Sequence, residues 1–158
     1  MAKNKIKLVY GGGSLGLMGE LSKSVHRNNG TVLGIIPKHL LEIEGINKNY
    51  GETIITEDMH VRKKTMYENS DAFLCLPGGI GTLEEVSEII TWFQLNISIK
   101  PIFFLNINGY WDNFRVLLEQ FVIEEFAHKD LLNYFHYFES VDKLLPALLS
   151  SFEIDSNE

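Results

Sequence analysis

The sequence predicts an α/β domain whose sheet is mostly parallel and flanked by helices. Short apolar runs alternate with amphipathic, helix-like stretches along the chain, which is the pattern of strands joined by helical crossovers. Most of these runs are continuously apolar, as in strands that are buried on both faces. The length of 158 residues suits one domain. In such sheets, ligands bind at the carboxyl ends of the strands.

The first half of the chain holds apolar runs separated by helix-like stretches. We expect strands at residues 6–10, 31–36 and 54–55, and helices at 17–28 and 58–69. The first run is rich in β-branched and aromatic residues and leads into consecutive glycines. Asn29-Gly30 is a typical helix stop, and Pro37 closes the second run.

The second half repeats this alternation. We expect strands at residues 72–76, 101–105 and 134–138, and helices at 83–95, 112–125 and 141–150. The run at 72–76 leads directly into a glycine-rich turn and then into a long helix-like stretch. Residues 151–158 are expected to form a disordered acidic tail, which leaves 1–150 as a single domain.

Charge and cysteine content narrow the classes of function. The formal net charge is −7, from 14 Lys plus Arg against 21 Asp plus Glu, so the chain should repel nucleic acids and anionic membranes. A small anionic ligand is still compatible with this charge. One cysteine gives no disulfide framework and favours the reducing cytoplasm. No apolar run reaches the roughly 18 residues of a membrane span, and the first residues do not resemble a signal peptide.

The strongest motif is PGGIGTLEE at residues 77–85. Glycines at a strand-to-helix turn let the backbone approach a ligand closely, and the start of the helix offers N–H groups to a phosphate. Thr82 could add a hydroxyl donor or cap the helix, with Glu85 as its capping-box partner. By itself, such a motif is equally typical of an ordinary tight turn.

A second glycine-rich motif, GGGSLGLMG, covers residues 11–19. Gly11, Gly13 and Gly16 match the glycine spacing of a dinucleotide-binding loop. That fingerprint also needs an acidic residue at the end of the next strand, where this chain has Ile36-Pro37-Lys38. The sequence therefore disfavours a dinucleotide and leaves a mononucleotide open.

A third motif, MHVRKK at residues 59–64, places Arg62 among lysines in an acidic protein. Taken alone, it is more typical of a solvated helix face than of a binding site. Next to a phosphate-binding helix, its guanidinium would instead offer bidentate contact to phosphate or ribose. The histidines show no metal-ligand spacing, so we expect no metal site. Cys75 lies in an apolar run and should be a small buried residue.

Together these motifs resemble those of the Lonely Guy family of cytokinin riboside 5′-monophosphate phosphoribohydrolases, long labelled possible lysine decarboxylases. The likeness continues in IITW at 89–92 and NGYW at 108–111, and it extends to about residue 150. It implies a Rossmann-like domain that forms a homodimer, and we expect the implied reaction to need no metal or organic cofactor. The implied substrate is a purine nucleoside 5′-monophosphate, of cytokinin type or AMP, and the products are free base and ribose 5-phosphate.

The resemblance also implies site residues, position by position. Arg62 and Glu85 fall at the family's catalytic pair. The implied substrate-binding positions, with glycines of both loops included, are Gly12, Gly13, Glu44, Lys63, Gly78, Gly79, Ile80, Gly81, Thr82, Leu83, Glu84 and Thr91.

The resemblance has one departure and leaves alternatives. Family members usually begin with a further strand, turn and helix, so we expect this chain to lack the family's first strand and helix. Lysine decarboxylation is disfavoured, because no lysine has a recognisable setting for pyridoxal phosphate. The main alternative is a non-catalytic nucleotide-binding module, which would not need both Arg62 and Glu85. Another is an interaction protein that uses the helix around 89–95 as a dimer surface.

Overall fold

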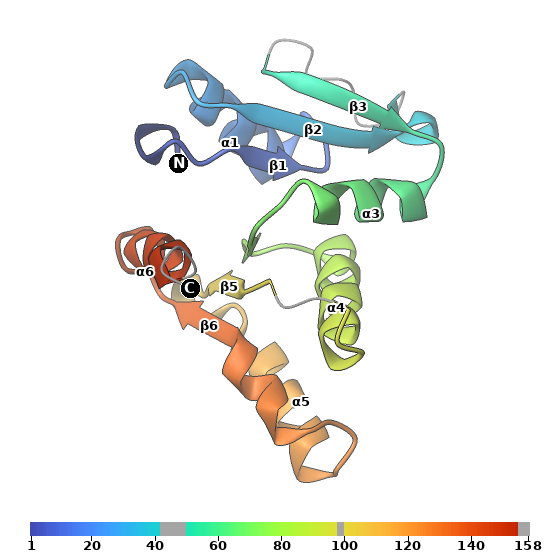
Figure 1. Cartoon of the computed structure of the whole chain (residues 1–158), viewed down its shortest axis with the longest axis vertical. Helices are drawn as coiled ribbons and strands as arrows, with labels where there is room; N and C mark the ends of the chain where they lie inside the picture. The colour runs from blue at the N-terminus through green and yellow to red at the C-terminus, as the bar shows by residue number, and fades with distance from the viewer. Residues whose placement is uncertain (42–49, 98–99, 155–158) are drawn as a thin grey trace. The chain divides into compact units, whose positions relative to one another are not determined.

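The computed structural model of the chain describes residues 1–41, 50–97 and 100–154 (Figure 1). The chain divides into two compact units, Met1–Ser70 and Asp71–Glu158. Each unit has its own three-stranded sheet, and every strand pair in both sheets is parallel. The predicted α/β class with parallel strands and flanking helices is confirmed. The expectation that 1–150 form a single domain stays a prediction.

The first unit holds a sheet with the strand order β1-β2-β3. Its elements are η1 (Ala2–Asn4), β1 (Leu8–Tyr10), α1 (Gly16–Arg27), β2 (Val32–Pro37), η2 (Lys38–Leu40), β3 (Glu52–Thr56) and α3 (Met59–Glu68). Leu8 pairs with Val32, and Leu33 pairs with Glu52. β2 is buried along its whole length because it is the central strand and both α1 and α3 pack against it.

Local chemistry explains where the helices of the first unit begin and end. The Asp58 carboxylate caps α3 by accepting a hydrogen bond from the Val61 N–H at 2.8 Å. After α1, Asn29 adopts a left-handed conformation with φ of 58°, as the predicted helix stop requires. The start of α3 and the end of α1 each lie within about one residue of the position expected from the sequence.

The second unit holds a sheet with the strand order β4-β5-β6. Its elements are β4 (Phe73–Cys75), α4 (Ile80–Gln94), β5 (Ile102–Leu105), η3 (Ile107–Gly109), α5 (Asp112–Ile123), η4 (Lys129–Tyr134), β6 (Phe135–Phe138) and α6 (Val141–Ile154). Phe73 pairs with Ile102, and Phe104 pairs with Tyr137. The carboxyl ends of β4 and β5 therefore lie side by side, and the loops that follow them share one edge of the sheet.

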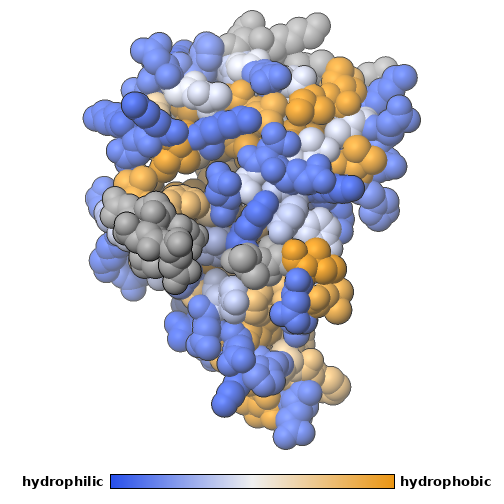
Figure 2. Space-filling view, viewed as in Figure 1, coloured by the Kyte–Doolittle hydropathy of each residue, from blue (hydrophilic) through white to orange (hydrophobic). Residues whose placement is uncertain are grey.

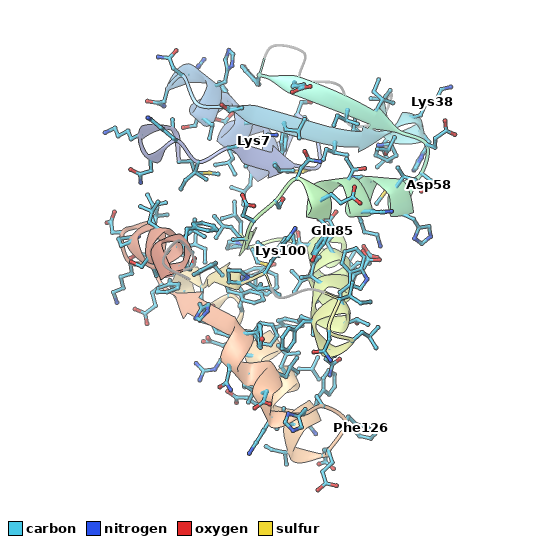
Figure 3. The ribbon with its side chains drawn as sticks, in the orientation of Figure 1. Lys7, Lys38, Asp58, Glu85, Lys100 and Phe126 are labelled. Carbon is cyan, nitrogen blue, oxygen red and sulfur yellow. The ribbon has the colours of Figure 1, made fainter. Side chains whose placement is uncertain are left out.

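Exposed apolar residues remain on the second unit. α5 and the segment after it carry Val116, Leu117, Phe121, Ile123 and Phe126 on the surface. Figure 2 shows hydrophobic residues among the charged ones in this region, and Figure 3 labels Phe126, which is 83% exposed. These side chains are available for contact with another molecule.

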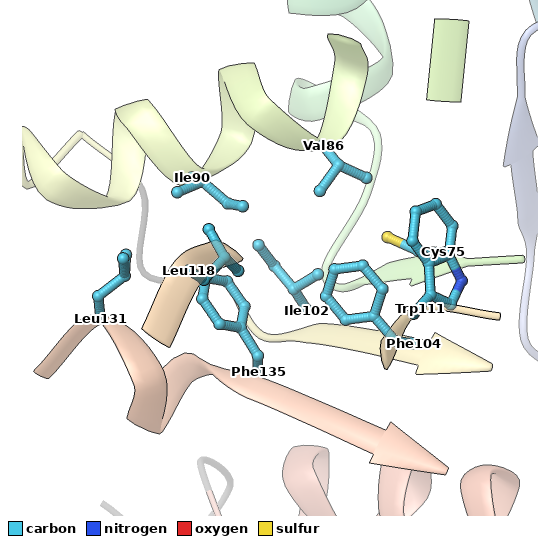
Figure 4. Packing of buried hydrophobic residues seen from close by; sticks show 9 residues of the cluster. All are labelled: Cys75, Val86, Ile90, Ile102, Phe104, Trp111, Leu118, Leu131 and Phe135. Atoms are coloured by element: carbon cyan, nitrogen blue, oxygen red, sulfur yellow. The ribbon is translucent and has the colours of Figure 1, made fainter. Parts of the chain in front are cut away.

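Aromatic packing around Phe104 forms the core of the second unit (Figure 4). Phe104 is fully buried, and its ring stacks on Tyr137 at 4.8 Å and meets the edge of Trp111 at 5.3 Å. The buried cluster comprises Cys75, Val86, Ile90, Ile102, Phe104, Trp111, Leu118, Leu131 and Phe135. The expected burial of Cys75 is confirmed.

The structure departs most from the sequence prediction at two helix boundaries and in the burial of one strand. α4 begins at Ile80 rather than at residue 83, which matters for the site below. Burial of β4 on both faces is expected, but Leu74 is exposed, and β4 is an edge strand of its sheet. α6 continues to Ile154, beyond its expected end at Ser150. Among the described residues, no helix is both long enough and apolar enough to span a membrane.

We predict that Phe104→Ala lowers the free energy of unfolding of the second unit by about 3–5 kcal/mol, since it leaves a cavity among rings that cannot close over it. Urea unfolding followed by circular dichroism measures this. The control Phe126→Ala removes the same ring from an exposed position and should change stability by less than about 0.5 kcal/mol. Equal losses in the two variants would contradict this description of the core.

Candidate functional site

The turn from β4 into α4 leaves backbone donors at the start of a helix. β4 ends at Cys75, and Gly79 is the N-cap of α4 without a side-chain capping bond. In the first backbone hydrogen bond of the helix, the Leu83 N–H donates to the Gly79 carbonyl oxygen at 3.1 Å. The N–H groups before Leu83 have no acceptor within the helix. They coincide with the positive end of the helix dipole, which is a suitable place for an anion.

The structure excludes the capping box that was one possible role for Thr82 and Glu85. Because α4 already begins at Ile80, Thr82 lies inside the first turn rather than at the cap. The Thr82 side chain lies instead against Gly78, at the position that a Cβ on Gly78 would occupy. Glu85 therefore does not pair with Thr82 in a capping box at the start of α4.

The glycines of this turn differ in what the fold requires of them. A Cβ on Gly78 would collide with Thr82, whereas a Cβ on Gly79 or Gly81 would meet nothing within 4 Å. Gly81 lies in the first turn of α4, where alanine would favour the helix. The packing of the described residues gives no reason for glycine at this position. A ligand that approaches the backbone closely would give one.

The carboxylate of Glu85 acts on the carboxyl end of β4. Burial raises the pKa of the Cys75 thiol from 9.0 to about 12, and the negative charge of Glu85 contributes to this rise. Cys75 is the last residue of β4, so the charge of Glu85 lies near the strand end. Figure 3 shows Glu85 on the first turns of α4. Glu85 is partly buried and lies on the same helix start as the glycines.

A residue that the sequence analysis gave no role contacts the turn. Tyr110, in the loop between β5 and α5, donates its hydroxyl to the Gly78 carbonyl oxygen at 2.6 Å. In the sequence, only the position of Tyr110 indicates a role: it lies in the motif NGYW, shortly after a strand whose carboxyl end lies at the same edge of the sheet. This position places the loop near the edge of the sheet where ligands bind, but it does not identify the atom that the Tyr110 side chain contacts.

In the first unit, Arg62 is held at the carboxyl ends of β1 and β2. Its side chain is only 7% exposed, and its Nε donates a hydrogen bond to the Ile35 carbonyl oxygen at 3.2 Å. One terminal nitrogen of the guanidinium occupies the space that a Cβ on Gly11 would need. The interpretation of Arg62 as part of a solvated helix face is therefore wrong. Lys63, the next residue, is partly buried.

Packing explains several glycines of the first glycine-rich loop. Gly11 makes room for Arg62, and Gly19 lies against the Ser14 carbonyl. Gly12 has a φ of 77° and packs against Ile36, while Gly13 is buried. Because the fold itself needs glycine at several of these positions, this loop gives weaker support for a bound ligand than Gly81 does.

The predicted site residues are thus divided between two units. The second unit brings Gly78, Gly79, Ile80, Gly81, Thr82, Leu83, Glu84 and Glu85 together at the start of α4, and the first unit holds Gly12, Gly13, Arg62 and Lys63. Thr91 lies about 16 Å along α4 from Ile80, at 1.5 Å per residue, and its hydroxyl donates to the Ser87 carbonyl. Glu44 lies outside the described residues. The pairing of Arg62 with Glu85 stays a prediction.

The described parts of the chain offer no candidate metal site. Among residues 1–41, 50–97 and 100–154, no group of three or more His, Cys, Asp or Glu side chains could hold an ion. The arrangement at the start of α4 has a different chemical character. It combines backbone N–H donors, which suit an oxyanion, with the neighbouring carboxylates of Glu84 and Glu85.

Comparisons with known proteins agree on one family. The family model described as "Possible lysine decarboxylase" matches residues 18–148. A cytokinin riboside 5'-monophosphate phosphoribohydrolase of Arabidopsis thaliana, LOG5, is 47% identical over 126 residues, covering 80% of this chain and 55% of the relative. A probable enzyme of the same name from Oryza sativa subsp. japonica, LOG4, is 44% identical over 148 residues, covering 94% of this chain and 64% of the relative. The chain thus spans less than two thirds of the length of either relative.

We predict opposite effects of alanine at two glycines of the turn. Gly81→Ala should raise the free energy of unfolding by about 0.5–1 kcal/mol, because its Cβ enters open space on a helix. Gly78→Ala should lower it by about 1–3 kcal/mol, because its Cβ collides with Thr82. Urea unfolding of each variant measures the change in the free energy of unfolding. A loss of stability in Gly81→Ala would show that the fold itself needs this glycine.

Proposed function

The chain belongs to the family described as "Possible lysine decarboxylase", the Lonely Guy family that its motifs predict, and from this premise we propose that it is a phosphoribohydrolase. Its substrate would be a purine nucleoside 5′-monophosphate, of cytokinin type or AMP. The relatives' names support hydrolysis of a cytokinin riboside 5'-monophosphate, and they favour an enzyme over a non-catalytic binding module.

Gly81 is the observation that carries this proposal. It lies where α4 would be more stable with alanine, and nothing in the described packing fills the space beside it. The neighbouring N–H groups have no acceptor within the helix. We therefore place the 5′-phosphate against the backbone of Gly79, Ile80, Gly81 and Thr82, with the Thr82 hydroxyl as a further donor. Leu83 and Glu84 complete this segment.

Binding of the phosphate would serve the reaction at a distance. The bond that breaks joins the sugar C1′ to the base nitrogen, on the side of the ribose away from the phosphate. Interactions with a remote group can position the reacting centre and so lower the entropic part of the barrier. A nucleoside without the phosphate would lose this anchor, so the proposal requires a strong preference for the monophosphate.

We assign the chemical step to Glu85. Cleavage of an N-glycosidic bond develops positive charge on the sugar ring, as in glycoside hydrolysis. The Glu85 carboxylate would stabilise this charge and orient a water molecule toward C1′. The oxygen of the water forms the new bond to C1′, the C1′–N bond breaks, and the proton from the water is transferred to the base. The products are the free base and ribose 5-phosphate, without any change of oxidation state.

The residues of the first unit would contribute cationic contacts. The guanidinium of Arg62 is held by Ile35 at a strand end and is directed toward the start of the glycine-rich loop at Gly11. Such a fixed, planar donor suits phosphate or ribose oxygens. We propose that Arg62 and Lys63 contact the nucleotide, along with Gly12 and Gly13. Roles for Glu44 and Thr91 rest on the family resemblance alone.

We further propose that the chain acts as a homodimer in the cytoplasm. The exposed apolar side chains of α5, with Leu95 and Ile97 after α4, would be covered by a second copy. Sedimentation velocity of the purified chain measures this, and we expect a single species of about twice the monomer mass of 18.0 kDa. A monomer at micromolar concentration would contradict the dimer and leave the proposed reaction untouched.

The central test of the reaction is Glu85→Gln, which keeps the shape of the side chain and removes its charge. We expect base release from AMP and from isopentenyladenosine monophosphate to fall by about a hundredfold or more, the scale of losing one preorganised electrostatic group. Chromatography of the released base measures turnover. Near-normal turnover would exclude Glu85 from the chemical step.

The matched control is Glu124→Gln, at the exposed C-cap of α5. It removes the same charge from the same unit, and we expect turnover like that of the unaltered chain. Adenosine serves as the substrate control. Release of adenine from adenosine at the rate seen with AMP would contradict the phosphate-anchoring part of the proposal.

A further inference from the structure

One side chain links the loop after β5 to the glycine-rich turn after β4. Tyr110 donates its hydroxyl to the Gly78 carbonyl oxygen at 2.6 Å. β4 and β5 are paired parallel strands, so both connections leave the same edge of the sheet. The Tyr110 side chain is 52% exposed, so packing alone leaves the direction of its hydroxyl open. The hydrogen bond to Gly78 sets that direction.

The carbonyl that Tyr110 binds belongs to the same peptide unit as the Gly79 N–H. A trans peptide is planar, so its C=O and N–H point in opposite directions, and the described residues contain no cis peptide. Glycine stands on both sides of this unit, where the absence of Cβ atoms leaves the plane free to rotate. A bond to the carbonyl therefore also fixes the direction of the N–H.

The loop that carries Tyr110 is itself held firmly. The Asn106 side chain accepts a hydrogen bond from the Trp111 N–H at 2.7 Å and donates one to the Asp112 carboxylate at 2.7 Å. The Tyr110 ring meets the buried Trp111 ring edge-on at 5.2 Å. Because these contacts already hold the backbone and the ring of Tyr110, its side chain loses little conformational freedom when the hydroxyl binds Gly78.

We propose that Tyr110 is a positioning residue for phosphate binding. Its hydroxyl holds the Gly78–Gly79 peptide so that the Gly79 N–H points away from Tyr110 and toward the phosphate of the nucleotide. The hydrogen bond also polarises the peptide and so strengthens the N–H as a donor. The inference rests on the proposed function, because it assigns the anion at this turn to the 5′-phosphate of the substrate. Tyr110 itself does not need to touch the substrate.

The test is Tyr110→Phe in the full chain, with binding of ribose 5-phosphate and AMP measured by calorimetry. Loss of one hydrogen bond should raise Kd for both ligands about five- to tenfold. KM for AMP should rise by a similar factor while kcat changes less than about twofold, because the phosphate of bound AMP still lies on the other N–H donors of the turn and still positions the ribose. The urea midpoint should stay close to that of the unaltered chain, since the side chain is largely exposed.

Tyr137→Phe is the matched control. It removes the same atom from the same unit, and among the described residues the Tyr137 hydroxyl is buried without a hydrogen-bond partner. We expect Kd and KM as in the unaltered chain. A normal Kd in Tyr110→Phe, or an equal rise in both variants, would overturn the positioning role while the hydrolase proposal stands.

A measurement without ligand separates the two proposals. In ¹⁵N relaxation-dispersion NMR, Tyr110→Phe should introduce microsecond-to-millisecond exchange at the Gly79 amide, since its peptide plane is released. An unchanged Gly79 amide would overturn the positioning role. Failure of the unaltered chain to bind AMP or ribose 5-phosphate would instead overturn the proposed function, and with it the assignment of this turn to a nucleotide phosphate.

Discussion

The early start of α4 is the constraint on which the site depends. Because the helix begins at Ile80 with glycine as its cap, its first N–H groups are left without intrahelical acceptors or a capping side chain. Gly81 then keeps that stretch of backbone free of a Cβ at some cost to the helix. The same start places Glu85 in the second turn, where its charge acts on the end of β4. One helix boundary thus leaves free backbone N–H donors and places a carboxylate within the first two turns of the same helix.

Each unit supports its half of the predicted site by packing of its own. In the second unit, the aromatic core around Phe104 fixes the paired ends of β4 and β5, from which the turn and the Tyr110 loop emerge. In the first unit, the helix cap at Asp58 sets the start of α3, and Arg62 lies one turn later against β2. Both units place polar groups at the carboxyl ends of parallel strands, where α/β sheets bind ligands.

Most of the fold could be predicted from the sequence, because buried parallel strands and their crossover helices leave strong local patterns. The start of α4 could not, since Thr82 followed by Glu85 satisfies the local rule for a capping box as well as Gly79 satisfies a glycine cap. The burial of Arg62 depends on a carbonyl 27 residues away, and the contact of Tyr110 on one 32 residues away. Contacts between residues so far apart in the chain produce no periodic pattern in a single sequence. The motif residues could therefore be predicted, but the groups that they contact could not.

The most direct test of the account is an amide NMR titration of the unaltered chain with AMP and, in parallel, with adenosine. If the phosphate lies on the exposed backbone at the start of α4, AMP shifts the amide resonances of Gly79, Ile80, Gly81 and Thr82 more than any others, and adenosine leaves them almost unchanged. Equal shifts with both ligands would contradict the account. So would shifts confined to other parts of the chain.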